Sequence, residues 1–68
     1  KSEIYQGVAT LYAKNEKYDT ALTFANKANE LSSTTERQFL IAKIYYLNGQ
    51  SDLAIIKMNN ILRQGFKN

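Results

Sequence analysis

An internal repeat with a period of 33 residues constrains the fold of this chain more than any other feature of its sequence. Shifting the chain by that period aligns these identical residues: Glu3 with Glu36, Ala9 with Ala42, Tyr12 with Tyr45, Asn15 with Asn48, Asp19 with Asp52, Ala21 with Ala54 and Asn26 with Asn59. Apolar positions also agree in type, as Val8 does with Ile41. Periods of about 20 to 50 residues are typical of repeat proteins, whose units stack on one another. The sequence therefore predicts a duplicated unit.

Each unit has the apolar spacing of two helices. In the first unit, one stripe has the spacing i, i+3, i+4 and i+7, which places its side chains on one helix face: Tyr5, Val8, Ala9 and Tyr12. A second stripe of small residues allows another helix to approach closely: Ala21, Leu22, Ala25 and Ala28. The second unit repeats both stripes, with Ile41, Ala42 and Tyr45, then Ala54, Ile55, Met58, Ile61 and Leu62. We expect four helices, at about residues 3–14, 18–31, 35–47 and 52–63.

Three local signals predict helix ends. Ser33 and Glu36 have the spacing of a capping box, in which each side chain bonds the other residue's backbone N–H. Gly49 suits a left-handed stop at the end of the third helix. Gly65 followed by Phe66 resembles a Schellman ending, with its hydrophobic contact, for the fourth helix.

Length and composition exclude several classes of function. The 68 residues make one small domain, with repeat one at about 2–34 and repeat two at about 35–68. The chain has no cysteine and no histidine, so it lacks disulfides, thiolate metal sites and the commonest general base. We therefore expect no enzyme, no cofactor and no metal. The net charge of +3 is spread over scattered lysines, which favours solubility over nucleic-acid binding, and no apolar run is long enough to span a membrane.

Two stretches of the first unit resemble the tetratricopeptide repeat, a helix-turn-helix of about 34 residues with the pattern W-x2-L-G-x2-Y, then A-x3-F. "YQGVATLY" at residues 5–12 is similar to the first part, and "YDTALTFANKA" at residues 18–28 to the second. Tyr18 stands where such repeats place an aromatic at the start of the second helix, and Ala25 stands where an aromatic is usual. The resemblance implies an all-α fold, a right-handed superhelical stack of two antiparallel helix pairs.

The resemblance also implies a function: the family binds a peptide or helix of a partner protein in a concave groove lined by the first helix of each unit. Carried over position by position, the groove residues are Gln6, Gly7, Thr10, Ala13, Lys14, Phe39, Leu40, Lys43, Tyr46 and Leu47. Phe39, Lys43 and Tyr46 share one helix face, and we expect this face to form a trough beside Gln6, Thr10 and Ala13. The other interpretation of Phe39, Tyr46 and Leu47 is packing between the repeats.

A second predicted surface is the C-terminal packing face formed by Ile55, Met58 and Leu62. We expect it to meet a neighbouring repeat or a second copy of the domain. Two alternatives to an independent interaction module remain open. The first is a regulatory or substrate-presenting domain of a larger enzyme. The second, weaker one is a helical nucleic-acid-binding module.

Overall fold

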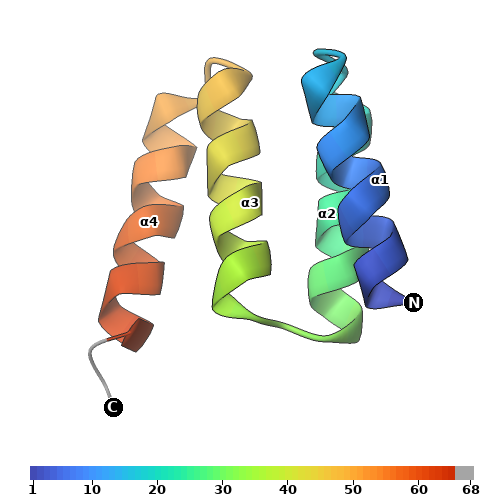
Figure 1. Cartoon of the computed structure of the whole chain (residues 1–68). Helices are drawn as coiled ribbons and strands as arrows, with labels where there is room; N and C mark the ends of the chain where they lie inside the picture. The colour runs from blue at the N-terminus through green and yellow to red at the C-terminus, as the bar shows by residue number, and fades with distance from the viewer. Residues whose placement is uncertain (66–68) are drawn as a thin grey trace.

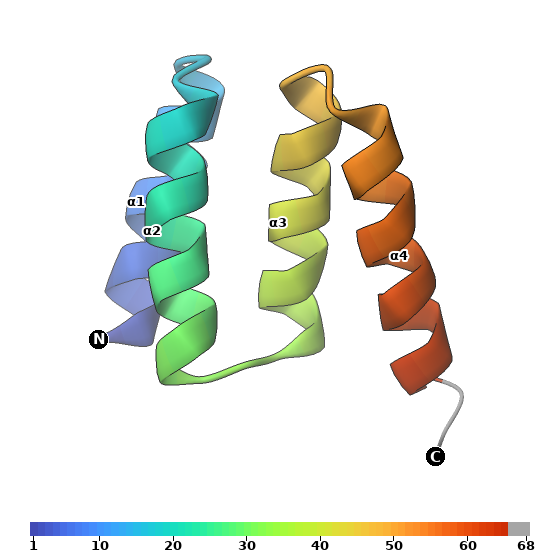
Figure 2. The same ribbon diagram turned by 180° about the vertical axis from the view of Figure 1, so that it is seen from behind.

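The computed structural model describes residues 1–65, which form four helices and, within that range, no strand. These are α1 (Ser2–Lys14), α2 (Tyr18–Leu31), α3 (Thr35–Leu47) and α4 (Ser51–Gly65). α1 packs on α2, α2 on α3 and α3 on α4, so that α4 lies at the far end of the row from α1 (Figures 1 and 2). The all-α prediction is confirmed, and each expected helix boundary lies within two residues of the observed one.

The turn inside each unit has the same hydrogen bonds. The Lys17 N–H donates to the Tyr12 carbonyl at 2.9 Å, and 33 residues later the Gln50 N–H donates to the Tyr45 carbonyl at the same distance. A hydrogen bond from an N–H to the carbonyl five residues earlier, at the end of a helix, is characteristic of the Schellman motif. The period read from the sequence is therefore also present in the backbone bonding of the two turns.

These motifs need one residue with a left-handed backbone. Gly49 takes that place after α3 with a φ of 80°, which confirms the predicted stop. The equivalent residue after α1 is Glu16, with a φ of 63°, a conformation that an L-residue adopts at a cost because its Cβ crowds the backbone. Gly65 is the last residue of α4, and the Schellman ending predicted there depends on Phe66, which lies outside the described residues.

The start of α3 differs from the prediction. Thr34 is the N-cap, and its hydroxyl accepts a hydrogen bond from the Arg37 N–H at 3.1 Å. The capping box predicted for Ser33 and Glu36 is wrong, because the helix begins one residue later than that motif requires. The Ser33 hydroxyl instead accepts a hydrogen bond from Gln38 Nε2 at 2.9 Å.

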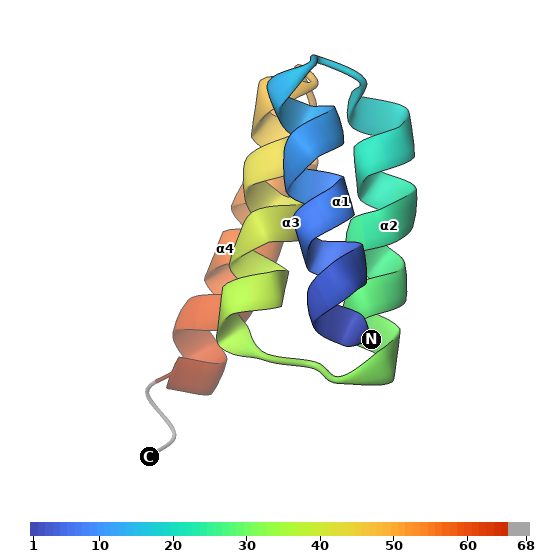
Figure 3. The same ribbon diagram turned by 45° about the vertical axis from the view of Figure 1, so that its right-hand side comes forward.

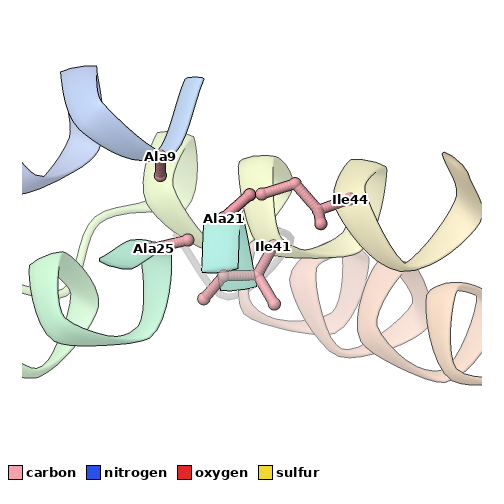
Figure 4. Packing of buried hydrophobic residues seen from close by; sticks show 5 residues of the cluster. All are labelled: Ala9, Ala21, Ala25, Ile41 and Ile44. Carbon is pink, nitrogen blue, oxygen red and sulfur yellow. The ribbon is translucent and has the colours of Figure 1, made fainter. Parts of the chain in front are cut away.

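Small residues hold the helices close together. The buried core combines alanines of α1 and α2 with isoleucines of α3: Ala9, Ala21, Ala25, Ile41 and Ile44 (Figure 4). Partly buried side chains surround it: Tyr12, Ala13, Tyr18, Leu22, Phe24, Leu40 and Tyr45. Because the alanines contribute only a methyl group, the helix backbones approach closely, as the predicted small-residue stripe requires.

An aromatic stack joins α1 to α2. The Phe24 ring lies parallel to the Tyr12 ring, with centroids 5.7 Å apart and 1° between their planes, and it also stacks on Tyr5 at 6.0 Å. Such pairs contribute about 0.5–1.5 kcal/mol beyond the area they bury. The resemblance placed an aromatic at Ala25, and the structure supplies one from Phe24 instead, one residue earlier.

Candidate functional site

An apolar groove lies between α3 and α4 and has a volume of about 660 Å³. We call it the α3–α4 groove; its lining residues are Phe39, Ala42, Lys43, Tyr46, Ser51, Ala54, Ile55, Met58 and Asn59. Among these residues only Lys43 is charged. The groove therefore has an apolar surface with a single cation in its wall, which suits an apolar ligand with an acidic group beside it.

α3 supplies one wall of this groove through residues spaced i, i+4 and i+7. Phe39, Lys43 and Tyr46 share a face, as the sequence predicted, and all three line the groove. Phe39 is 50% exposed and Tyr46 is 65% exposed. Neither ring is therefore buried between the two units of this chain. Large apolar side chains gathered at one exposed surface are typical of interaction sites.

α4 supplies the other wall. Ala54 is buried and forms part of the floor, while Ile55 is 57% exposed at the rim. Of the predicted C-terminal packing face, Ile55 and Met58 line the groove. Leu62 is exposed as well but does not contribute to the lining. Two surfaces predicted separately from the sequence, one on α3 and one on α4, thus form a single groove.

The remaining predicted groove residues lie elsewhere. A much smaller groove of about 120 Å³ between α1 and α3 has the lining residues Thr10, Ala13, Lys14, Leu40, Lys43, Ile44 and Leu47. Only Lys43 lines both grooves, so the structure does not place Phe39 and Tyr46 beside Thr10 and Ala13 as expected. The reason is helical geometry, since one residue along α3 turns a side chain by about 100°.

Gln6 and Gly7 complete the predicted set. Gln6 accepts a hydrogen bond through Oε1 from Arg37 Nε at 2.9 Å, so its side chain joins α1 to α3. Gly7 is exposed, and a Cβ built on it would meet no atom within 4 Å. In the view of Figure 3, α1 is seen between α3 and α2. The hydrogen bond to Arg37 places Gln6 at the contact between the two units.

Arg37 is a structural residue that the sequence reasoning missed. Its side chain is only 8% exposed, and besides Gln6 it bonds the Ser32 carbonyl through Nη1 at 2.7 Å. Both acceptors are neutral oxygens, and they give hydrogen bonds to two of the N–H donors of this mostly buried guanidinium. The available signal was a cation on the same helix face as Ile41 and Ile44. Arg37 thus fixes α3 against the first unit.

Residues 1–65 have neither a metal-binding cluster nor a membrane-spanning helix. No group of three or more acidic, histidine or cysteine side chains in this part of the chain is placed to hold a metal ion. None of the four helices is long and apolar enough to cross a membrane. The α3–α4 groove differs from a second groove of about 760 Å³ along α1 in having two exposed aromatic rings in its wall.

Comparison with known proteins finds no match: no family model, no curated protein and no solved structure is significantly similar to the chain. The class of the protein rests on its own architecture, which is all-α with four helices. Its two units have helices and turns that correspond across the 33-residue period.

Proposed function

We propose that this protein is a non-catalytic protein–protein interaction module of the tetratricopeptide-repeat type, which binds a helix of a partner protein. Its two units form the right-handed superhelical stack that this class implies. Support comes from the period, which recurs in the helix bounds, in the turn hydrogen bonds and in the positive φ of Glu16 and Gly49. A scaffold of packed helices with an open apolar surface needs no catalytic group in order to act.

The observation that carries the proposal is the pair of exposed rings in the α3–α4 groove. Phe39 and Tyr46 lie on a different face of α3 from the core residues, and each is at least 50% exposed. Large aromatic anchors are among the residues that most often dominate binding energy at protein interfaces. The groove of about 660 Å³ also lies within the range of about 300–1,000 Å³ typical of ligand sites. Another groove of about 760 Å³, lined in part by Gln6, Gly7 and Thr10, lies along the outer side of α1, so the exposed rings and not the volume favour the α3–α4 groove.

The shape and charge of the groove define the partner. The antiparallel helices α3 and α4 lie side by side and form the two walls of the groove (Figures 1 and 2), which suits an amphipathic helix laid between them. Ile55 and Met58 on α4 face the rings on α3 and contact an aliphatic row. Lys43 pairs with an acidic residue at the edge of that row. The partner is thus a helix with aliphatic residues on one face and a flanking carboxylate.

The test is selection of binders from a displayed library of amphipathic helices. Selected peptides should bind the double variant Phe39→Ala/Tyr46→Ala at least tenfold more weakly, since each anchor typically contributes more than about 1 kcal/mol. The matched control is Leu31→Ala/Leu53→Ala, which removes two exposed leucines that do not line the groove. Circular dichroism should show that both variants remain helical. Peptides that bind all three proteins equally would contradict the groove as the site.

A further inference from the structure

Each end of the molecule has an exposed face, one on α1 and one in the α3–α4 groove. By the 33-residue period, these two faces correspond to the two sides of the interface between the units. Within the molecule, α3 packs on the first unit through its inward face, formed by Arg37, Leu40, Ile41 and Ile44. The residues 33 positions earlier form the outer face of α1: Ile4, Gly7, Val8 and Leu11. Ile4 is 68% exposed and Leu11 is 61% exposed. The face of α1 that corresponds to the buried face of α3 is therefore exposed.

The α3–α4 groove is the matching half. The first unit contacts Ile41 and Ile44 of α3 through three buried alanines, Ala9, Ala21 and Ala25. Their equivalents 33 positions later are Ala42, Ala54 and Met58, and all three line the groove. The α3–α4 groove of the second unit thus corresponds to the surface of the first unit on which α3 packs.

We infer that the occupant of the α3–α4 groove is α1 of a second copy of this chain, so that copies join head to tail. This inference rests on the proposed helix-binding role of the groove. The joint between copies continues the interface already present between the two units of one copy. Each copy contributes its groove at one end and the outer face of α1 at the other.

Side-chain size favours α1 as the occupant over a helix like α3. At the interface inside the molecule, the small Ala13 and the large Leu40 line the same groove. At the joint between copies the sizes are exchanged, because Tyr46 replaces Ala13 and Gly7 replaces Leu40. The same exchange occurs in the core, where Ala25 and Ile41 correspond to Met58 and Val8. Packing at interior density requires that a large residue meet a small one, which both interfaces satisfy.

The polar pair at the internal interface is exchanged in the same way. Inside the molecule, Arg37 on α3 donates a hydrogen bond to Gln6 on α1. Their equivalents at the joint are Ile4, on the outer face of α1, and Phe39, in the groove. A hydrogen-bonded pair is thus replaced by two apolar residues. Both members changed together, so this pair leaves no single polar side chain facing an apolar one at either interface.

A head-to-tail joint has a distinct signature in solution. It uses different surfaces on the two copies, so it adds copies one after another unless the rotation between them closes a ring. Analytical ultracentrifugation of the full chain should show an average mass that grows with concentration up to about 1 mM. A symmetric contact, groove against groove, would stop at a dimer instead.

Complementary variants give the decisive measurement. Leu11→Glu disables the outer face of α1, and Tyr46→Glu disables the groove; both side chains are more than 60% exposed, so the helices remain folded. We expect each variant alone to be a monomer, with association weakened about 10- to 100-fold, and the two mixed to form a one-to-one dimer. Leu31→Glu, at an exposed site outside both faces, is the control and should associate like the unchanged chain.

Gly7→Glu separates association from folding. A Cβ at Gly7 meets no atom within 4 Å, and glutamate favours a helix more than glycine does, so this variant should melt higher. It should nevertheless fail to associate, because its side chain enters the space that Tyr46 of the next copy needs. A Gly7→Glu protein that associates like the unchanged chain would refute the joint.

Two further results would overturn the inference. If Leu11→Glu still dimerises while Tyr46→Glu does not, the groove pairs with itself. If the unchanged chain is monomeric at every concentration, a second copy is not the occupant. In that case library helices that bind the chain but not Phe39→Ala/Tyr46→Ala would leave the proposed helix-binding function intact, with a helix of another protein in the groove. If no library helix binds either, the proposed function fails as well.

Discussion

The turn between α1 and α2 offers a sharp test of the repeat, because its left-handed residue is not glycine. Glu16 has a φ of 63°, whereas Gly49 takes the equivalent place with a φ of 80°. The left-handed conformation costs an L-residue about 1–2 kcal/mol, since its Cβ crowds the backbone. Glu16→Gly removes that Cβ and should therefore stabilise the fold.

The size of the effect follows from two opposing contributions. Relief of the left-handed backbone contributes about 1–2 kcal/mol. Glycine also gives the unfolded chain more freedom, which costs about 0.4–1 kcal/mol. The net gain is roughly 0.5–1 kcal/mol, which raises the melting temperature by about 2–8 °C in a domain of this size. Gly49→Ala should lower it by a similar amount, because a Cβ at Gly49 meets no atom within 4 Å and the cost is the backbone conformation alone.

Thermal and urea unfolding followed by circular dichroism measures both changes. Glu16→Ala is the matched control, since it removes the carboxylate but keeps the Cβ. If Glu16→Ala raises the melting temperature as much as Glu16→Gly does, the carboxylate near the end of α1 is responsible and the φ argument is wrong. A Gly49→Ala protein that melts at an unchanged temperature would show that the turn after α3 does not require glycine.

Three further substitutions test the packing described above by the free energy of unfolding. Ala21→Leu should cost about 1–3 kcal/mol, because Ala21 is fully buried between helices, and an unchanged stability would refute the close approach. Gln6→Ala should cost about 1.5–3 kcal/mol by removing the acceptor of Arg37 Nε, whereas a cost near zero would show that water replaces the bond. Asn29→Leu should stabilise by about 1 kcal/mol or more, since the buried Asn29 Oδ1 has no hydrogen-bond partner in the described chain; a loss of stability would reveal one.

The helices were predictable because their determinants are local. Apolar residues spaced three and four apart, a small-residue stripe and a glycine stop depend only on the helix that contains them. The cap of α3 was not predictable to the residue. Ser33 and Thr34 are neighbours with similar hydroxyl chemistry, and only the observed bond from the Arg37 N–H shows which one caps the helix.

The site was predictable only in part, because its two walls come from different helices. The face of Phe39, Lys43 and Tyr46 follows from spacing within α3. What faces it depends on how α3 rotates on its neighbours, and that rotation is set by burial of Ile41 and Ile44. The hydrogen-bond acceptors of Arg37 also lie outside its own helix, on α1 and in the loop after α2, so no local sequence pattern predicts them.

The alanine-rich core links the proposed self-association to stability. Three alanines and two isoleucines form the central cluster, so the chain buries little apolar surface for its size, and domains of this size are marginal. Ile4 and Leu11 are mostly exposed, and full burial of such a side chain contributes about 1.5–3 kcal/mol. Association that covers them should stabilise the folded chain by mass action. The melting temperature of the unchanged chain should therefore rise with concentration while that of Leu11→Glu stays constant, and a melting temperature independent of concentration in both would mean that the fold is complete without a second copy.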